Sequence, residues 1–165
     1  MNTTTSKLQP ALIGGLVTGV LSALPFIGAF NACCCLWIVT GGVTAAYLLQ
    51  DREPNSIQVG DGALVGLMAG VIGAFVYLIL SIPITLLMAP MMSAFTDRVL
   101  NDSNFPPEFR EMVSSGVGTA LGIILGFFAY LAAGIVFSTL GGVLGTLIFR
   151  KPARPPVIDV PPTDL

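Results

Sequence analysis

The sequence contains no histidine, and only 10% of its 165 residues are charged. Soluble domains carry charge on roughly a quarter of their residues, so this chain lacks the polar surface that keeps a folded domain in water. Its seven basic and nine acidic residues leave long charge-free runs at 8–50, 62–96 and 112–149. These absences exclude a nucleic-acid-binding protein, a disordered chain and a hydrophilic catalytic domain.

The groups that support catalysis are also missing from the charge-free runs. Ion-coupled transporters, proton pumps and intramembrane enzymes bury Asp, Glu, Lys, Arg or His in their membrane segments, because those groups carry the coupling or the acid-base step. The sequence has no phosphate-binding loop, no HExxH and no GxSxG motif, and without histidine it has no Ser-His-Asp set. We therefore predict a protein that is not an enzyme, with no catalytic residues, no cofactor and no metal site.

Apolar residues are abundant, at 54% of the chain, and the mean hydropathy is +0.87. A bilayer core of about 30 Å is crossed by about 20 helical residues. The charge-free runs therefore predict an all-α polytopic membrane protein with four transmembrane helices. The predicted spans are 10–29, 33–49, 62–82 and 114–149. Splitting the last run near Gly134 gives five crossings, which is the alternative.

The segment 83–111 differs in character from the spans around it. Its apolar residues fall on one face at helical spacing while polar residues fill the rest, which is typical of a helix lying on the membrane surface. The apolar residues are Met91, Met92, Phe95 and Val99. We predict an interfacial amphipathic helix here, between the third and fourth spans. Residues 150–165 are proline-rich and predict a disordered tail after a single transmembrane domain over 1–149.

The distribution of basic residues predicts the orientation. With four crossings, five fall on one side of the membrane and two on the other. The first group is Lys7, Arg52, Arg150, Lys151 and Arg154, and the second is Arg98 and Arg110. Because lysine and arginine concentrate in cytoplasmic loops, we predict a multi-pass protein of the cell membrane with both termini in the cytoplasm.

Small residues recur at every fourth position in three of the predicted spans. The glycines of this zipper pattern are Gly15, Gly19, Gly62, Gly66, Gly70, Gly118, Gly122 and Gly126. Residues four apart share one helix face, so these glycines form grooves that let helix backbones approach closely in lipid. We predict that they pack the chain's own helices together, with self-association as the alternative.

The same pattern contains an internal repeat. GLVTGVLSAL recurs as GLMAGVIGAF 51 residues later, and Gly41-Gly42-Val43 recurs as Gly141-Gly142-Val143. The chain thus divides into two helical hairpins that point the same way. A parallel repeat of this kind relates its halves by an axis along the membrane normal.

The three cysteines are consecutive: Cys33, Cys34 and Cys35. Three successive helical residues spread over about 200°, so their thiols cannot converge on one tetrahedral metal. The favoured interpretation is that they are small, polarizable side chains packed near the membrane interface beside Trp37. A redox, lipidation or intersubunit metal role is the weaker alternative.

A resemblance to a known group of proteins rests on two strings separated by a short charged loop. They are GGVTAAYLLQ and DGALVGLMAGVIGA. Over about 11–75 the chain resembles small uncharacterised prokaryotic four-helix integral membrane proteins with a GGxxAxYL ending before a GAxxGxxAG helix start. That resemblance implies a prokaryotic four-helix membrane protein and transfers no activity or catalytic residues.

From these observations we predict a packing or accessory subunit of a membrane assembly. Its partners are the lipid bilayer and either a second copy of the chain or another membrane protein. The alternative is a channel or facilitator for a small neutral solute, with the solute passing between the two repeats.

Overall fold

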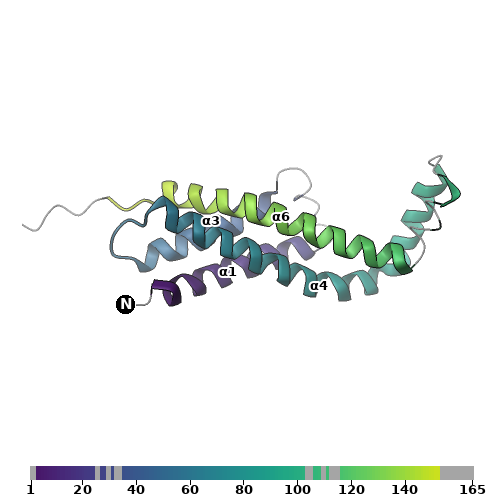
Figure 1. The fold of residues 1–165 in the computed structure, drawn as a ribbon, viewed down its shortest axis with the longest axis horizontal. Coiled ribbons are helices and arrows are strands. Elements are labelled where there is room, and N and C mark those ends of the chain that lie inside the picture. Colours follow the sequence, from purple (N-terminus) through teal and green to yellow (C-terminus); the bar gives the residue numbers. More distant parts are fainter. Residues whose placement is uncertain are drawn as a thin grey trace, which may run out of the picture.

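The computed structural model describes residues 3–24, 27–28, 31, 35–102, 106–108, 111 and 116–152. The long elements within them are four helices and no strand (Figure 1). They are α1 (Thr3–Ala23), α3 (Leu36–Arg52), α4 (Val59–Asp102) and α6 (Gly116–Ile148). The prediction of an all-α protein with four main helices is confirmed. Because α6 continues unbroken through Gly134, the five-crossing alternative is wrong.

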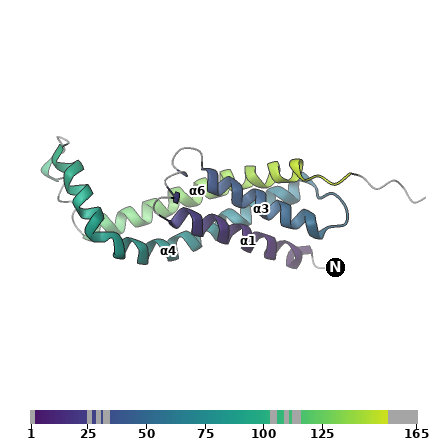
Figure 2. The same cartoon turned by 180° about the vertical axis from the view of Figure 1, so that it is seen from behind.

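The helices form an elongated bundle of two antiparallel hairpins. Helix α1 packs on α3 and α4, α6 packs on the same two helices, and α3 also contacts α4. The start of α1, the end of α3, the start of α4 and the end of α6 all lie at one end, which we call the proximal end (Figures 1 and 2). At the other end α4 and α6 continue past α1 and α3. We call the projecting residues 78–88 of α4 and 120–129 of α6 the distal arm.

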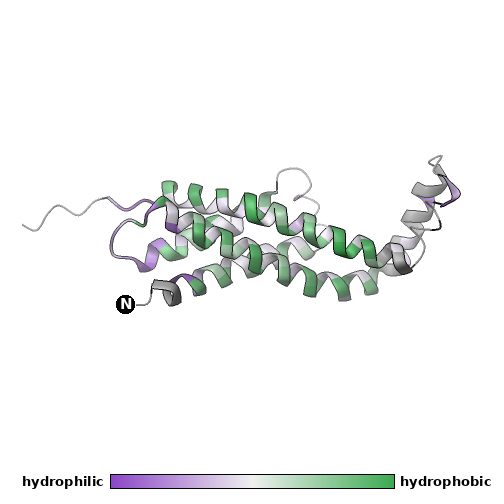
Figure 3. Cartoon of the chain, viewed as in Figure 1, coloured by the Kyte–Doolittle hydropathy of each residue, from purple (hydrophilic) through white to green (hydrophobic). Residues whose placement is uncertain are grey.

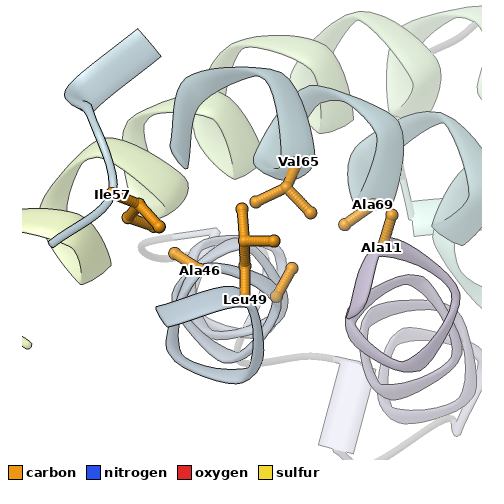
Figure 4. Packing of buried hydrophobic residues seen from close by; sticks show 7 residues of the cluster. Ala11, Ala46, Leu49, Ile57, Val65 and Ala69 are labelled. Atoms are coloured by element: carbon orange, nitrogen blue, oxygen red, sulfur yellow. The ribbon is translucent and has the colours of Figure 1, made fainter. Parts of the chain in front are cut away.

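Small and branched side chains fill the interior near the proximal end. Leu49 of α3 and Val65 of α4 point toward each other, and Ala11 of α1 lies beside Ala69 of α4 (Figure 4). These four side chains are at most 1% exposed. Alanine and glycine predominate at the contacts, so the helices meet through their backbones rather than through large interlocking side chains.

Helix α1 has its large residues on the outside and its small residues on the inside. Its leucines and valine at four-residue spacing are 38–49% exposed: Leu8, Leu12, Leu16, Val20 and Leu24. Its opposite face is buried and consists of small residues: Ala11, Gly14, Gly15, Thr18, Gly19 and Ser22. A helix in water buries its leucines, so this reversed arrangement is typical of a bundle surrounded by lipid. Apolar residues predominate along the helices (Figure 3), and many large apolar side chains of α4 and α6 are also exposed.

Two helices are long and apolar enough to cross a membrane, over Val59–Met88 and Ala120–Ile148. They contain the predicted spans 62–82 and most of 114–149. Helix α3 corresponds to the predicted span 33–49, while α1 begins before residue 10 and ends at Ala23 rather than at residue 29. Crossing by these two shorter helices stays a prediction.

The predicted separation between the third span and an interfacial helix is wrong, because α4 runs without a break from Val59 to Asp102 through Pro83 and Pro90. Proline removes one backbone donor and bends a helix, and in lipid the freed groups are satisfied locally rather than by water. Ser81 donates a hydrogen bond to the Leu78 carbonyl, and Ser93 donates one to the Pro90 carbonyl. These bonds lie beside the prolines and do not reach the Ile79 and Leu86 carbonyls, which lose their i+4 donors. Beyond the apolar stretch, α4 turns away from the bundle axis (Figure 1).

Most of the remaining predicted surface segment and tail cannot be compared with the structure. Of the four apolar residues proposed to share a face, only the Met91 side chain is described, and it is exposed. Residues 150–152 continue past α6 without helical structure, and residues 153–165 lie outside the described part of the chain.

Candidate functional site

Gly15 and Gly19 bring α1 against α4. A Cβ atom added at Gly15 would lie 2.7 Å from Cγ2 of Ile72, and one added at Gly19 would lie 2.6 Å from Cβ of Val76. Real Cβ atoms do not approach this closely, so only glycine fits while the backbones keep their separation. The large residues of α4 thus fill a groove that the α1 glycines leave open.

The contact between α1 and α3 also depends on glycine, at positions that the sequence pattern did not single out for packing. A Cβ at Gly14 would lie 2.5 Å from the Gly41 carbonyl oxygen and 2.8 Å from Cβ of Ala45. Gly41 in turn lies against the side chain of Thr18. The signal that could have identified these two glycines was the pairs Gly14-Gly15 and Gly41-Gly42, since each pair lacks side chains on two adjacent helix faces.

The second hairpin closes through Gly62, Gly66 and Gly70 of α4. A Cβ at Gly62 would lie 2.7 Å from the Gly142 carbonyl oxygen, and a Cβ at Gly66 would lie 3.0 Å from the Gly142 Cα. Gly70 lies equally close to the backbone of Gly134. Ser138 of α6 donates a buried 2.7 Å hydrogen bond to the Gly66 carbonyl, which joins the two helices directly.

Glycines also join the two hairpins, between α3 and α6. A Cβ at Gly42 would lie 3.0 Å from the Gly142 nitrogen, and one at Gly141 would lie 3.1 Å from the Val39 Cα. One turn further along α6, a Cβ at Gly145 would lie 2.9 Å from Cβ of Ala46. Gly142 therefore contacts both helices that neighbour α6.

Three of the eight predicted packing glycines lie toward the other end of α6. Gly122 and Gly126 have no atom within 4 Å of an added Cβ, and both are exposed. The prediction that they pack helices of the same chain is wrong, because α1 and α3 end before reaching the distal arm and α4 does not approach α6 closely at these two positions. Gly118 is partly exposed in the first turn of α6.

The two halves of the sequence repeat pack against different partners. Gly15 and Gly19 of α1 face α4, whereas their counterparts Gly66 and Gly70 face α6. Moreover, α3 packs on α4, but among the described residues α1 does not pack on α6. A two-fold axis along the membrane normal would make these pairs equivalent, so the similar sequences occupy non-equivalent places in the bundle.

A polar cluster lies where α1 ends and α3 begins. The Asn31 amide nitrogen donates a 2.7 Å hydrogen bond to the Ser22 hydroxyl, and the Asn31 carbonyl oxygen accepts one of 3.1 Å from the Trp37 backbone nitrogen. The Trp37 indole donates to the Ile27 carbonyl at 2.7 Å. Asn31 therefore links the last turn of α1 to the first turn of α3.

The proximal end is tied together by charged and polar side chains. The Lys7 ammonium contacts the Asp61 carboxylate at 2.5 Å and joins α1 to α4, while Arg52 donates to the Gln9 side chain at 2.7 Å and joins α3 to α1. Lys151 donates to the carbonyl of Glu53 at 2.8 Å. A cation at a helix C-terminus opposes the negative end of its dipole, so Lys151 caps α3.

A single cysteine can be placed. Cys33 and Cys34 lie outside the described residues, while Cys35 is partly exposed and has a free thiol. Cys35 precedes α3 with φ 48°, in the left-handed region that side chains other than glycine and asparagine rarely adopt. It forms no side-chain hydrogen bond with the helix start. The described residues bring no three metal-ligating side chains together.

The bundle thus has glycine at its contacts between helices, hydroxyl and amide groups bonded inside it, and ionic groups at its proximal end.

The model of the family described as "MJ1491 transmembrane domain" matches residues 8–151, from the second turn of α1 to just beyond α6. No curated protein and no solved structure matches the chain. The family match covers most of the chain, and the chain belongs to the MJ1491 transmembrane domain family.

Proposed function

We propose that this membrane protein is a non-enzymatic packing or accessory subunit of a membrane assembly. The observation that carries the proposal is the composition of the bundle interior. Glycine lies at the contacts of α1 with α3 and α4 and at those of α6 with α3 and α4. The buried polar residues among those described are uncharged: Thr18, Ser22, Gln50, Ser138 and Thr146. Such an interior holds helices together and offers no acid-base group for a reaction.

Hydrogen bonds already engage these buried polar groups. Ser138 donates to the Gly66 carbonyl, and Gln50 binds both the Asn55 carbonyl and the Ile57 nitrogen at 3.0 Å. Polar groups satisfied in this way stabilise a bundle in lipid. Their arrangement supports a role in architecture.

The experiment is purification of the tagged full-length chain in mild detergent, with mass spectrometry of the proteins that accompany it. A matched purification of an unrelated small membrane protein with the same tag is the control. We expect one companion membrane protein at fixed stoichiometry, or a defined oligomer of the chain itself. Recovery of the chain as a monomer without a companion contradicts the proposal.

A facilitator for a small neutral solute is the alternative. A path between the two hairpins requires space along the contacts of α1 with α4 and of α3 with α6. Those contacts are the ones at which Gly15, Gly19, Gly42 and Gly141 leave no room for a Cβ atom. The accessory role is therefore preferred. Solute-dependent swelling of proteoliposomes that contain the purified chain would reverse this preference.

We also propose that the proximal end lies in the cytoplasm, and that the protein is prokaryotic. The proximal cations Lys7, Arg52, Arg150 and Lys151 support this orientation, since basic residues concentrate on the cytoplasmic side. The test uses Asn55→Cys in a background where the three native cysteines are serine. An impermeant thiol reagent should label this cysteine only after the cells are permeabilised, and labelling of intact cells contradicts the orientation.

A further inference from the structure

A groove of about 250 Å³ runs between α4 and α6 in the distal arm. One wall carries three hydroxyl side chains of α4 at four-residue spacing: Tyr77, Ser81 and Thr85. The opposite wall carries Gly122 and Gly126 of α6, which leave the groove open because they have no side chains. Residues four apart share one helix face, so each helix presents a continuous stripe to this groove.

The groove begins where the close packing of α4 and α6 ends. At its inner end Tyr77 stacks on Tyr130, with ring centroids 4.3 Å apart and planes inclined by 15°. The Tyr130 hydroxyl is buried and has no hydrogen-bond partner within the described structure. Nearer the bundle, Gly70 and Gly134 bring the two backbones together. The aromatic stack therefore closes the groove on the side of the packed bundle.

The hydroxyls of the groove have unused hydrogen-bonding capacity. Ser81 gives its proton to the Leu78 carbonyl at 3.0 Å and keeps its oxygen lone pairs as acceptors. The hydroxyls of Tyr77 and Thr85 form no hydrogen bond with any described residue, so both are available as donors. In a hydrocarbon environment such groups are costly to leave unpaired, and a ligand with oxygen atoms would satisfy them.

The surroundings define the chemistry of the ligand. Among the described residues, no acidic or basic side chain lines the groove, so none of them compensates a phosphate or an ammonium group. The α4 residues around it are strongly exposed and apolar: Ile79 at 67%, Leu86 at 72% and Leu87 at 82%. Leu125 of α6 is 62% exposed. The groove is therefore reached from the lipid and not through a charged, watery entrance.

We propose that this groove binds the glycerol region of an uncharged membrane glycerolipid. The Tyr77 and Thr85 hydroxyls donate to oxygens of the ligand, and Ser81 accepts a hydrogen bond from its free hydroxyl. Gly122 and Gly126 provide the space, and the hydrocarbon chains lie along the exposed leucines of the arm. This role is separate from the packing role, because none of the five groove residues belongs to the glycine contacts of the bundle.

The test uses the full-length chain in phosphatidylcholine nanodiscs that contain a photoactivatable diacylglycerol. The wild-type chain should crosslink within 77–88 and 120–128. The variant Ser81→Ala with Thr85→Val removes two hydroxyls at nearly constant size and should lower the crosslinked fraction by about tenfold, as expected for two lost hydrogen bonds. Gly126→Leu fills the groove and should abolish crosslinking there.

The matched control is Thr139→Val, which removes an α6 hydroxyl that donates to the Ile135 carbonyl of its own helix. It should leave crosslinking unchanged, and all variants should keep wild-type elution in size-exclusion chromatography and wild-type circular dichroism. Equal crosslinking by the groove variants and the wild type would overturn the proposal. Displacement of the probe by glycerol alone would overturn it in favour of a water-soluble solute, and equal displacement by phosphatidic acid and diacylglycerol would overturn the uncharged class.

Discussion

At the scale of single residues, the bundle depends on glycines, because the absence of a Cβ atom lets the helix backbones approach closely. Gly142 is in contact with α3 and α4 at once, and a Cβ there would meet the Gly66 Cα at 3.0 Å. The hydrophobic effect does not drive helices together in lipid. Stability therefore comes from such close van der Waals contact and from a few hydrogen bonds across helices. Each contact is therefore sensitive to one added or removed atom.

Ser138 provides one of the direct hydrogen bonds between α6 and α4. We expect Ser138→Ala to lower the free energy of unfolding by about 1 kcal/mol, because the buried Gly66 carbonyl loses its extra donor. Thermal unfolding in detergent measures the effect. Thr139→Val is the control, since the Thr139 hydroxyl bonds only its own helix at the Ile135 carbonyl. An equal loss in both variants would contradict a specific role for Ser138.

Asn31 fixes the geometry where α1 and α3 end. Removing its amide in Asn31→Ala leaves the Ser22 hydroxyl and the Trp37 backbone nitrogen without a partner, at a cost of about 1–3 kcal/mol. Trp37 is the only tryptophan of the chain, so its fluorescence reports this site directly. We expect a shifted emission maximum and stronger quenching by acrylamide. Thr40→Val, one turn further along α3, should change neither, and an unchanged spectrum in Asn31→Ala would contradict the linking role.

At the scale of helices, the apolar runs predicted how many main helices there are. The four-residue spacing identified Gly15, Gly19, Gly62, Gly66 and Gly70 at the contacts, but not the equally close contacts of α3 and of the second half of α6. Pro83 and Pro90 misled the prediction of where α4 ends, because proline terminates most helices in water. Inside lipid no water is available to satisfy freed backbone groups, so helical structure continues through the prolines with a bend. The sequence alone does not distinguish a proline that ends a helix from one that bends it.

The wrong prediction that Gly122 and Gly126 pack against other helices also has its cause at the scale of helices. Their spacing is identical to that of Gly15 and Gly19, so the pattern predicts the same packing. Whether a glycine face packs on a helix depends on how far and how closely the neighbouring helices run. Helix α1 stops at Ala23, and no described atom of α4 lies within 4 Å of a Cβ added at these glycines. The network of Asn31 was not predictable either, because it requires the path of the chain between α1 and α3 rather than any periodicity.

We attribute the bend of α4 to its two prolines, Pro83 and Pro90, and this attribution can be tested. Replacing both prolines by alanine restores two backbone donors and should straighten α4. Spin labels at Val59→Cys and Ser93→Cys, in the background without native cysteines, should then move apart toward the span of about 51 Å for a straight helix. The pair Val59→Cys and Ile79→Cys precedes both prolines and should keep its distance. If the distance between the labels at residues 59 and 93 is unchanged by the substitutions, the prolines do not cause the bend.

At the scale of the whole molecule, the packed part of the bundle and the distal arm have different characters. The packed part is closed by glycine contacts and tied at the proximal end by Lys7, Arg52 and Lys151. The arm has exposed leucines and a hydroxyl-lined groove. Close helix contacts are therefore confined to the packed part, and the arm leaves apolar and hydroxyl side chains exposed.

The central claim is that helix contacts through glycine hold the bundle together, and the measurement that tests it most directly compares two substitutions within α6. Gly142→Leu directs a large side chain against the backbone of α4, whereas Gly122→Leu enters open space. We expect Gly142→Leu to lose about 3 kcal/mol or more and to lower the midpoint of thermal unfolding in detergent by about 10 °C, with Gly122→Leu close to wild type. Equal midpoints for the two variants would contradict the claim.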